Sequence, residues 1–136
     1  MNPADQIIRI VAAVVCDDHG QTLLVRKRGT LTFMQPGGKR DPGESDLDAL
    51  AREIAEELGC EIIPSEARHL GDFSAPAANE AGAIVEASLY AVSLRGDPVA
   101  QAEIAELRWL DPSDPNPPLL AALTELHVLP RLRQPR

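Results

Sequence analysis

The sequence predicts an α/β protein, and two observations carry that prediction. Aliphatic and β-branched runs of strand length alternate with turn residues along most of the chain, whereas residues 45–60 have the spacing of an amphipathic helix. A shorter amphipathic stretch at residues 119–126 follows a proline-rich segment and predicts a closing helix. Because 136 residues suffice for one hydrophobic core but not for two, we expect a single domain over residues 1–136.

Strands are expected where apolar runs lie between turn signals. The first two, residues 7–15 and 22–28, flank an Asp-Asp-His-Gly turn and predict a β-hairpin. Residues 83–94 form a long apolar run typical of a central strand, and the small, polar residues 75–82 indicate a loop. Further strands or extended segments are expected at residues 33–36, 61–63, 68–73 and 103–110.

One stretch organises the chain, a glycine turn at residues 37–44 that leads into the first helix. Apolar residues recur on one face of this helix and would pack on a sheet. Ser45 is a suitable N-cap residue, and Gly59 is a suitable residue just beyond the C-terminus. The sequence therefore predicts both ends of the helix as well as its buried face.

The other side of the helix carries three glutamates. Glu53, Glu56 and Glu57 stand at i, i+3 and i+4, so their side chains project from neighbouring positions. Like charges at this spacing destabilise a helix by about 0.2–0.5 kcal/mol per pair. One interpretation is a solvated acidic face that Arg52 partly balances. The other is a site for a hard divalent cation, which takes carboxylate oxygens and substrate phosphates as ligands.

The full spacing of this stretch favours the second interpretation. It reads Gly38, five residues, Glu44, seven residues, and then Arg-Glu-Ile-Ala-Glu-Glu-Leu-Gly-Cys at residues 52–60. With these letters at these offsets the chain resembles the Nudix hydrolase family and its MutT-like branch. Cys60 takes the last apolar position of the signature, where it packs as a small hydrophobe. The resemblance implies a Nudix-type α/β/α sandwich, in which a mixed central sheet lies between helices.

The resemblance also implies an activity. Nudix hydrolases are metal-dependent pyrophosphohydrolases that cleave the phosphoanhydride of a nucleoside diphosphate linked to another group, such as a (d)NTP. An ADP-ribose or NDP-sugar pyrophosphatase is one alternative, and a nucleotide-sensing module that does not hydrolyse is another. The base, the leaving group and the number of metal ions stay open.

The resemblance assigns roles to the residues of the signature. Mg²⁺ or Mn²⁺ would be held by Glu53, Glu56 and Glu57 together with the Gly38 carbonyl. Glu53 or Glu57 is a candidate general base, because a carboxylate crowded by others has a raised pKa. Arg52 would orient the glutamates.

Two further acidic residues are assigned by likeness to the family. Glu44 would bind the metal through water or brace the loop. Glu103, the first residue of the expected last strand, matches a further carboxylate of the metal site and is a third candidate for the base, with Glu106 as its rival. The structural alternative for Glu103 and for Glu106 is a solvated strand residue.

Substrate contacts are expected from the basic end of the second strand and from the glycine loop. Arg26 or Lys27 would contact phosphate, and a strand end held in water by charges is the structural alternative. At Gly37 and Gly38 the missing side chains let the backbone approach a ligand. Lys39 follows them in the same loop.

Recognition of the base is a separate expectation. Asn116 resembles the asparagine with which MutT-like members contact the nucleobase, unless it is simply a turn residue. Phe73 or Tyr90 would stack on a base. Pro76 lies near the position of a proline that marks ADP-ribose-cleaving members.

Composition excludes several classes of protein. A net charge of −8 without a basic tail argues against nucleic-acid binding, because a duplex binder needs a cationic surface. No apolar run is long enough for a membrane span, and the first residues lack a signal-peptide layout, so we expect a cytoplasmic protein. Cys16 and Cys60 are expected to be buried free thiols. The assembly, a homodimer included, stays open.

Overall fold

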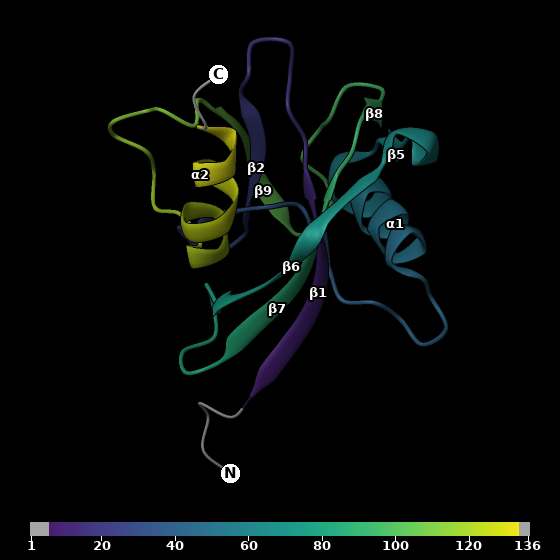
Figure 1. The fold of residues 1–136 in the computed structure, drawn as a ribbon, viewed down its shortest axis with the longest axis horizontal. Helices are drawn as coiled ribbons and strands as arrows, with labels where there is room; N and C mark the ends of the chain where they lie inside the picture. Colours follow the sequence, from purple (N-terminus) through teal and green to yellow (C-terminus); the bar gives the residue numbers. More distant parts are fainter. Residues whose placement is uncertain (1–5, 134–136) are drawn as a thin grey trace.

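The computed structural model describes residues 6–133. Strands make up most of the regular structure, with one long helix in the first half and a helical segment near the end (Figure 1). The elements in chain order are β1 (Ile7–Val14), β2 (Thr22–Lys27), β3 (Phe33–Met34), β4 (Gly37–Gly38), α1 (Asp46–Leu58), β5 (Glu61–Ile62), the 3₁₀ turn η2 (Pro64–Glu66), β6 (Arg68–Pro76), β7 (Ile84–Ala91), β8 (Leu94–Arg95), β9 (Ile104–Leu110), the π-helical turn η3 (Thr124–Val128) and α2 (Leu129–Leu132).

The largest sheet is mixed. Its strand order is β4-β1-β7-β6, and β1 pairs with β7 in parallel, whereas the other two pairs are antiparallel. A second, antiparallel sheet has the order β3-β2-β9, and β5 pairs with β8. The prediction of an α/β fold with a mixed central sheet is therefore confirmed, and so is the interior position of the strand that follows the small polar loop.

Helices lie on opposite sides of the strands. Figure 1 shows α1 on one side and η3 with α2 on the other. Successive residues of a strand point to opposite faces, and β1 shows this directly. Val11 and Ala13 pack in the cluster that contains Ile54 of α1, whereas Ala12 packs in the cluster that contains Val128. Both faces of β1 are thus buried, which is why its sequence is almost continuously apolar.

The ends of α1 follow the sequence prediction. The Ser45 hydroxyl accepts a hydrogen bond from the backbone N–H of Asp48 at 3.1 Å. At the other end Gly59 takes the left-handed conformation, with φ of 68°, and its N–H donates to the Ala55 carbonyl. These caps satisfy backbone groups that would otherwise lack partners, and so they fix where the helix starts and stops.

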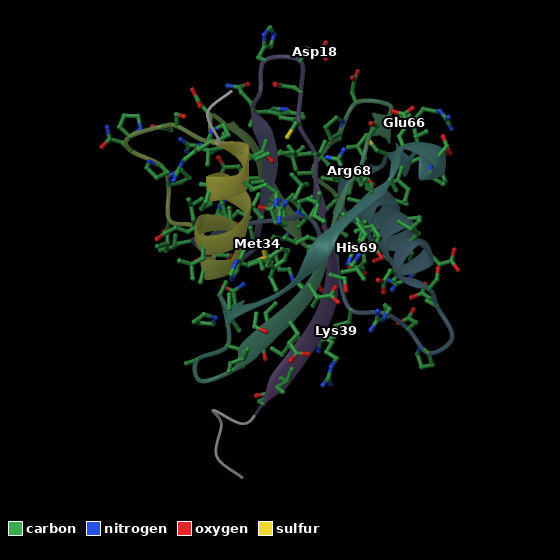
Figure 2. All side chains as sticks on the ribbon, in the orientation of Figure 1. Asp18, Met34, Lys39, Glu66, Arg68 and His69 are labelled. Atoms are coloured by element: carbon green, nitrogen blue, oxygen red, sulfur yellow. The ribbon has the colours of Figure 1, made fainter. Side chains whose placement is uncertain are left out.

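The predicted hairpin of the first two strands is wrong beyond its turn. One bridge joins Cys16 to Thr22, and the N–H of Leu23 donates to the Val15 carbonyl at 2.9 Å. Past that point β1 enters the mixed sheet and β2 enters the other one. Asp18 lies at the tip of the turn (Figure 2). The turn signal was local, whereas the partners of each strand come from distant parts of the chain.

Three smaller expectations also differ from the structure. Strand β6 runs on through Pro76, where the sequence indicated a loop, because that part pairs with β7. The closing helical segment starts later than predicted, at residue 122, and includes Pro130. Pro130 lies in the first turn of α2, directly after the π-helical turn. Proline is tolerated at such a position although it has no backbone N–H to donate. Cys60 is buried as expected, but Cys16 is exposed.

No helix within residues 6–133 is both long enough and apolar enough to cross a membrane.

Candidate functional site

A cavity of about 500 Å³ lies between the glycine loop with α1 on one side and the start of the closing helical segment on the other. Most of the predicted site residues line this cavity, although they come from four separate parts of the chain. They are Lys27, Gly37, Gly38, Lys39, Arg52, Glu53, Glu56, Glu57 and Glu103.

The two glycines are required by close approach of other atoms. A Cβ at Gly37 would lie 2.1 Å from the Val11 carbonyl oxygen of the neighbouring strand, and the φ of Gly37 is 149°. A Cβ at Gly38 would lie 2.1 Å from Oε2 of Glu53. Gly37 is therefore needed to pair β4 with β1, whereas Gly38 makes room for a carboxylate at the cavity.

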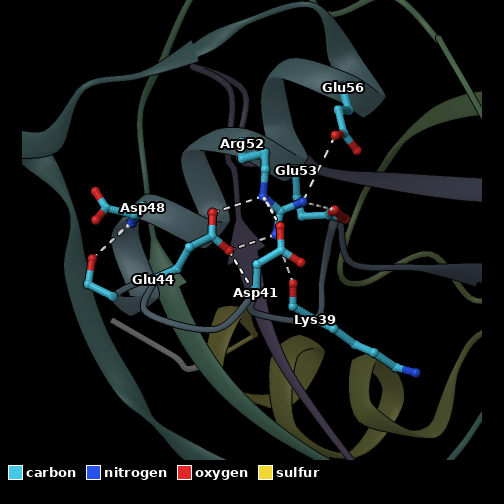
Figure 3. A network of polar contacts seen from close by, with 8 residues as sticks. Lys39, Asp41, Glu44, Asp48, Arg52, Glu53 and Glu56 are labelled. Carbon is cyan, nitrogen blue, oxygen red and sulfur yellow. Dashed lines mark hydrogen bonds and ion pairs between the residues drawn. The ribbon is translucent and has the colours of Figure 1, made fainter.

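Arg52 is the centre of a polar network at the outer side of the cavity (Figure 3). Its Nε and Nη2 donate to the two carboxylate oxygens of Glu44, each at 2.9 Å. Nη2 also donates to the Lys39 carbonyl at 3.0 Å, and Nη1 donates to Glu53 at 2.8 Å. Arg52 thus links the glycine loop to the helix and holds one of the glutamates, Glu53.

Glu44 braces the loop in this network. Its Oε1 accepts the N–H of Asp41 at 2.7 Å, in addition to the bonds from Arg52. The hydrogen bonds from Arg52, with that from the Asp41 backbone, lower the pKa of Glu44 to about 2. Glu44 does not line the cavity. Of the two roles that the sequence left open, the contacts support the loop brace.

Glu57 has the opposite surroundings. Only 8% of its surface is exposed, and burial raises the pKa of its carboxyl group to about 8, while the nearby charge of Glu53 adds to the rise. A hydrogen bond from the Gly37 N–H, at 3.2 Å, opposes the rise, as does the charge of Lys27. Glu57 is therefore a carboxyl group whose charged form is poorly compensated in the protein alone.

Glu53 is intermediate between these two. Burial raises its pKa, and the hydrogen bond and charge of Arg52 act against that rise. Its carboxylate lies against Gly38, and it accepts a hydrogen bond from Arg52 on the same helix. Glu53 is thus held in place by the network while it faces the cavity.

The oxygen-rich wall suits a hard divalent cation by its chemistry. Carboxylate oxygens are the ligands that Mg²⁺ and Mn²⁺ take in proteins, and a cation would supply the charge that the buried Glu57 carboxylate lacks. Within residues 6–133, however, no three His, Cys, Asp or Glu side chains are already gathered closely enough to hold a metal ion. Glu53 turns to Arg52 and Glu57 to Gly37 instead.

The structure separates the two basic residues that the sequence could not. Lys27 lines the cavity, and its charge lowers the pKa of both Glu53 and Glu57. Arg26 points to the other face of β2, where its Nε donates to Glu106 at 3.1 Å and its Nη1 to the Thr30 carbonyl. Of the two residues, only Lys27 lines the cavity.

Glu103 and Glu106, the two candidates for a further carboxylate at the site, differ in the same way. Glu103 lines the cavity, whereas Glu106 pairs with Arg26 and does not. The cavity is therefore bounded by a further carboxylate from outside the helix, at the position that the sequence favoured.

Three residues predicted to contact a base do not line the cavity. Asn116 is exposed in the segment after β9, where its N–H donates to the Asp114 side chain at 2.9 Å, the pattern of a turn. Phe73 and Tyr90 lie on β6 and β7, away from the cavity wall. Their assignments rested on likeness and on the scarcity of aromatic residues, and neither signal reports on distance in the fold.

Sequence reasoning missed the polar pair at the inner wall. Gln35 and Thr124 are both buried and both line the cavity. The Thr124 hydroxyl donates to Oε1 of Gln35 at 2.9 Å, and Nε2 of Gln35 donates to the Ala13 carbonyl at 2.9 Å. A glutamine directly before Pro-Gly-Gly was the available signal. Its partner, 89 residues further along the chain, could not be found from the sequence.

Known proteins share this combination of fold and site. Residues 7–132 match the family described as the NUDIX domain. The chain is 33% identical over 75 residues to an 8-oxo-dGTP diphosphatase of Haemophilus influenzae, which covers 52% of this chain and 55% of that protein. It is 39% identical over 49 residues to an RNA pyrophosphohydrolase of Vibrio cholerae, which covers 36% of this chain and 28% of that protein.

A solved structure agrees over a longer stretch. A MutT NUDIX hydrolase from Burkholderia pseudomallei superposes with a TM-score of 0.70 at 27% identity, and the match covers 85% of this chain and 91% of that one. These two curated relatives are matched over only about half of their length or less, so they show the kinship rather than the substrate. The family match spans nearly all the described residues, and the chain therefore belongs to the Nudix family, as a MutT-like member.

Proposed function

We propose that this protein is a metal-dependent pyrophosphohydrolase that cleaves the phosphoanhydride of a nucleoside diphosphate linked to another group, such as a (d)NTP. The observation that carries the proposal is Glu57, a buried carboxyl group with its pKa raised to about 8 at the wall of a cavity that Lys27 and Glu53 also line. Such surroundings are typical of functional sites. The relatives named as diphosphatase and pyrophosphohydrolase support the same reaction class.

The reaction asks for positioning and charge compensation. The oxygen of a water molecule bonds to one phosphorus of the anhydride, the bond from that phosphorus to the bridging oxygen breaks, and the bridging oxygen leaves with the second phosphate. The proton of the water passes to a glutamate carboxylate. We propose Glu53, Glu57 or Glu103 for this step, because each lines the cavity.

Residues of the chain would divide the remaining work. Glu53, Glu56, Glu57 and the Gly38 carbonyl would hold Mg²⁺ or Mn²⁺, which when bound would neutralise phosphate charge and orient water. Lys27 would contact a phosphate, and Lys39 lies at the same wall. Arg52 would keep Glu53 facing the cavity through its hydrogen bond. Cytoplasmic location, the assembly and the expected absence of nucleic-acid partners stay predictions.

Chromatographic analysis of the products from a panel of nucleotides tests this function: a (d)NTP would give a nucleoside monophosphate and pyrophosphate, and ADP-ribose or an NDP-sugar would give a nucleoside monophosphate and a sugar phosphate. The panel holds normal and oxidised dNTPs, ADP-ribose, NDP-sugars and dinucleoside polyphosphates, each with Mg²⁺, with Mn²⁺ and with chelator. We expect turnover only with metal. Preference for ADP-ribose or an NDP-sugar would move the substrate to that alternative. Metal-dependent nucleotide binding without turnover would indicate a sensor, and neither binding nor turnover would contradict the proposal.

A further inference from the structure

The turn before β9 has an unusual backbone at the cavity. Ala102 has a φ of 53°, and it is the only residue other than glycine with a positive φ in the part of the chain that the structure describes. This left-handed conformation is unfavourable for alanine, and such residues persist where their surroundings hold them. Ala102 and the next residue, Glu103, both line the cavity. The unusual conformation is therefore located where a carboxylate enters the site.

On one side the turn is hydrogen-bonded to α1. The N–H of Gln101 donates to the Glu57 carbonyl at 3.0 Å, and the N–H of Ile104 closes the turn by donating to the Gln101 carbonyl at 3.0 Å. Gly59 leaves room for this arrangement, because a Cβ there would lie 2.7 Å from the Gln101 side chain. The turn is thus fixed to the last residues of α1, which carries the other glutamates.

Arg28 holds the turn from the opposite side. Its backbone N–H donates to the Glu103 carbonyl at 2.8 Å, and its side-chain Nε donates to the Ala102 carbonyl at 3.2 Å. Arg28 does not line the cavity. The side chain of Arg28 therefore contacts the two-residue segment that presents Glu103, without being placed to contact a ligand itself.

The strand pairing changes register at the same place. Arg26 pairs with Glu106, but Lys27 pairs with Ile104, so Ala105 is an extra residue on β9. A bulge of this kind bends a strand and redirects its side chains, and bulges are frequent next to active sites. Here it brings Glu103 to the cavity on which the Lys27 side chain also borders.

We propose that Arg28 is a positioning residue, which holds the strained turn at Ala102 through its Nε so that the Glu103 carboxylate is ordered at the cavity before substrate arrives. This inference rests on the proposed function for its catalytic consequence. The strained conformation needs support, and the bond from Arg28 reaches the carbonyl of the strained residue itself. The backbone bond of Arg28 would survive a side-chain substitution, so the side chain can be tested alone.

A double-mutant cycle tests the assignment. Arg28→Met keeps the unbranched apolar stem of the side chain but removes its donors, and we expect kcat to fall by about tenfold with KM nearly unchanged, since an ordering bond from a charged group is lost. In a Glu103→Gln protein, the same substitution should change kcat by less than about twofold, because the carboxylate that Arg28 positions is absent. Arg95→Met is the matched control, as Arg95 is an exposed, ion-paired arginine on β8.

Amide hydrogen exchange supplies a readout that does not depend on turnover. Arg28→Met should speed exchange at Gln101 and Ile104 by about tenfold, whereas Arg95→Met should leave both unchanged. If the wild-type protein hydrolyses no nucleotide, the proposed function fails, and the exchange result still decides whether Arg28 holds the turn. Unchanged exchange in Arg28→Met overturns the inference. So does a tenfold kcat loss that is equally large in the Glu103→Gln background, or a rise in KM alone, which would mean direct substrate contact.

Discussion

The two ends of the stretch between Gly38 and Gly59 surround their carboxylates in opposite ways. At the outer end Glu44 accepts hydrogen bonds from Arg52 and from the Asp41 backbone, and its pKa falls to about 2. At the inner end Glu57 is buried, has one weak backbone bond, and its pKa rises to about 8. The same residue type is thus stabilised as an anion at one end and destabilised as an anion at the other.

Under the proposed function, this difference separates a structural carboxylate from a functional one within a single motif. The outer network satisfies its charges, so it would be kept by selection for stability alone. The Glu57 carboxylate is buried near Glu53 with little compensation, which lowers stability and is expected where function requires it. Two glutamates of one sequence motif therefore have different physical roles. Substitutions of Glu44 and of Glu57 should differ in whether they change stability or activity.

The largest expected effect is loss of turnover in Glu57→Gln. The substitution keeps the size of the side chain but removes the charge, and we expect kcat to fall by about 100-fold or more, the scale associated with general acid–base catalysis or loss of a metal ligand. Steady-state kinetics with the best substrate of the panel measures it. Glu66→Gln, an exposed glutamate of η2, is the control. Retention of wild-type kcat would remove Glu57 from the site.

The second effect contrasts the two glycines of the loop. Gly37→Ala places a Cβ against backbone atoms of β1, which cannot move cheaply, and should lower the melting temperature sharply. Gly38→Ala meets only the Glu53 side chain, which can swing away, so this protein should fold while kcat falls by about tenfold or more. Thermal melts and kinetics on both proteins measure the contrast. An active, stable Gly37→Ala protein would contradict it.

The helix and its face could be predicted from the sequence because their signals are local. Capping residues, apolar spacing and the offsets of Glu53, Glu56 and Glu57 all lie within two turns of chain on either side. The two glycines could be noticed from the sequence, but the reason why Gly37 must be glycine is its approach to Val11 of β1, which lies earlier in the chain. What failed were predictions that need distant partners. The turn after β1 indicated a hairpin, but β1 takes its parallel neighbour from residues 84–91.

For site residues outside the helix, too, the sequence was informative where the signal was local and failed where a distant partner decides. The period of a strand placed Lys27 and Arg26 on opposite faces but could not say which face meets the cavity. That depends on β9, which supplies Glu106 to one of them. Gln35 could be noticed from its place before Pro-Gly-Gly, but its partner Thr124 could not, because the two residues meet only in the fold. The strain at Ala102 has no signature in the sequence either, since nothing about alanine predicts a positive φ.

A moderate effect sharpens the distinction between the two basic residues. Lys27→Met should lower kcat/KM by about tenfold, since a charge-assisted phosphate contact contributes about 1.5–3 kcal/mol. Arg26→Met should have a smaller effect, because Arg26 is engaged with Glu106 on the other face. Kinetics of both variants with one nucleotide measure the difference, and Arg95→Met serves again as the control. An equal loss in the two proteins would return Arg26 to the phosphate site.

The smallest effect, and the most direct test of the comparison, is the dependence of metal-free stability on pH. Glu57 has a raised pKa in the folded protein, so the folded state holds its proton more tightly than the unfolded state does. The stability that this proton contributes is complete below pH 4.5, the usual value, and is lost as pH rises towards 8. Each pH unit in that window corresponds to at most about 1.4 kcal/mol.

Glu44 should show the opposite sign. Its pKa is lowered, so the stability that its charge contributes is present above pH 4.5 and is lost as pH falls towards 2. At pH 8 without metal we therefore expect Glu57→Gln to be more stable than wild type and Glu44→Gln to be less stable. Urea unfolding at pH 5, 6.5 and 8 measures both differences, and subtracting wild type removes the groups that the proteins share. The Glu57→Gln advantage should grow from pH 5 to pH 8, whereas the Glu44→Gln deficit should stay nearly constant over that range. A Glu57→Gln protein less stable than wild type at pH 8 would show that its carboxylate is well compensated after all, and the contrast between the two ends of the motif would not hold.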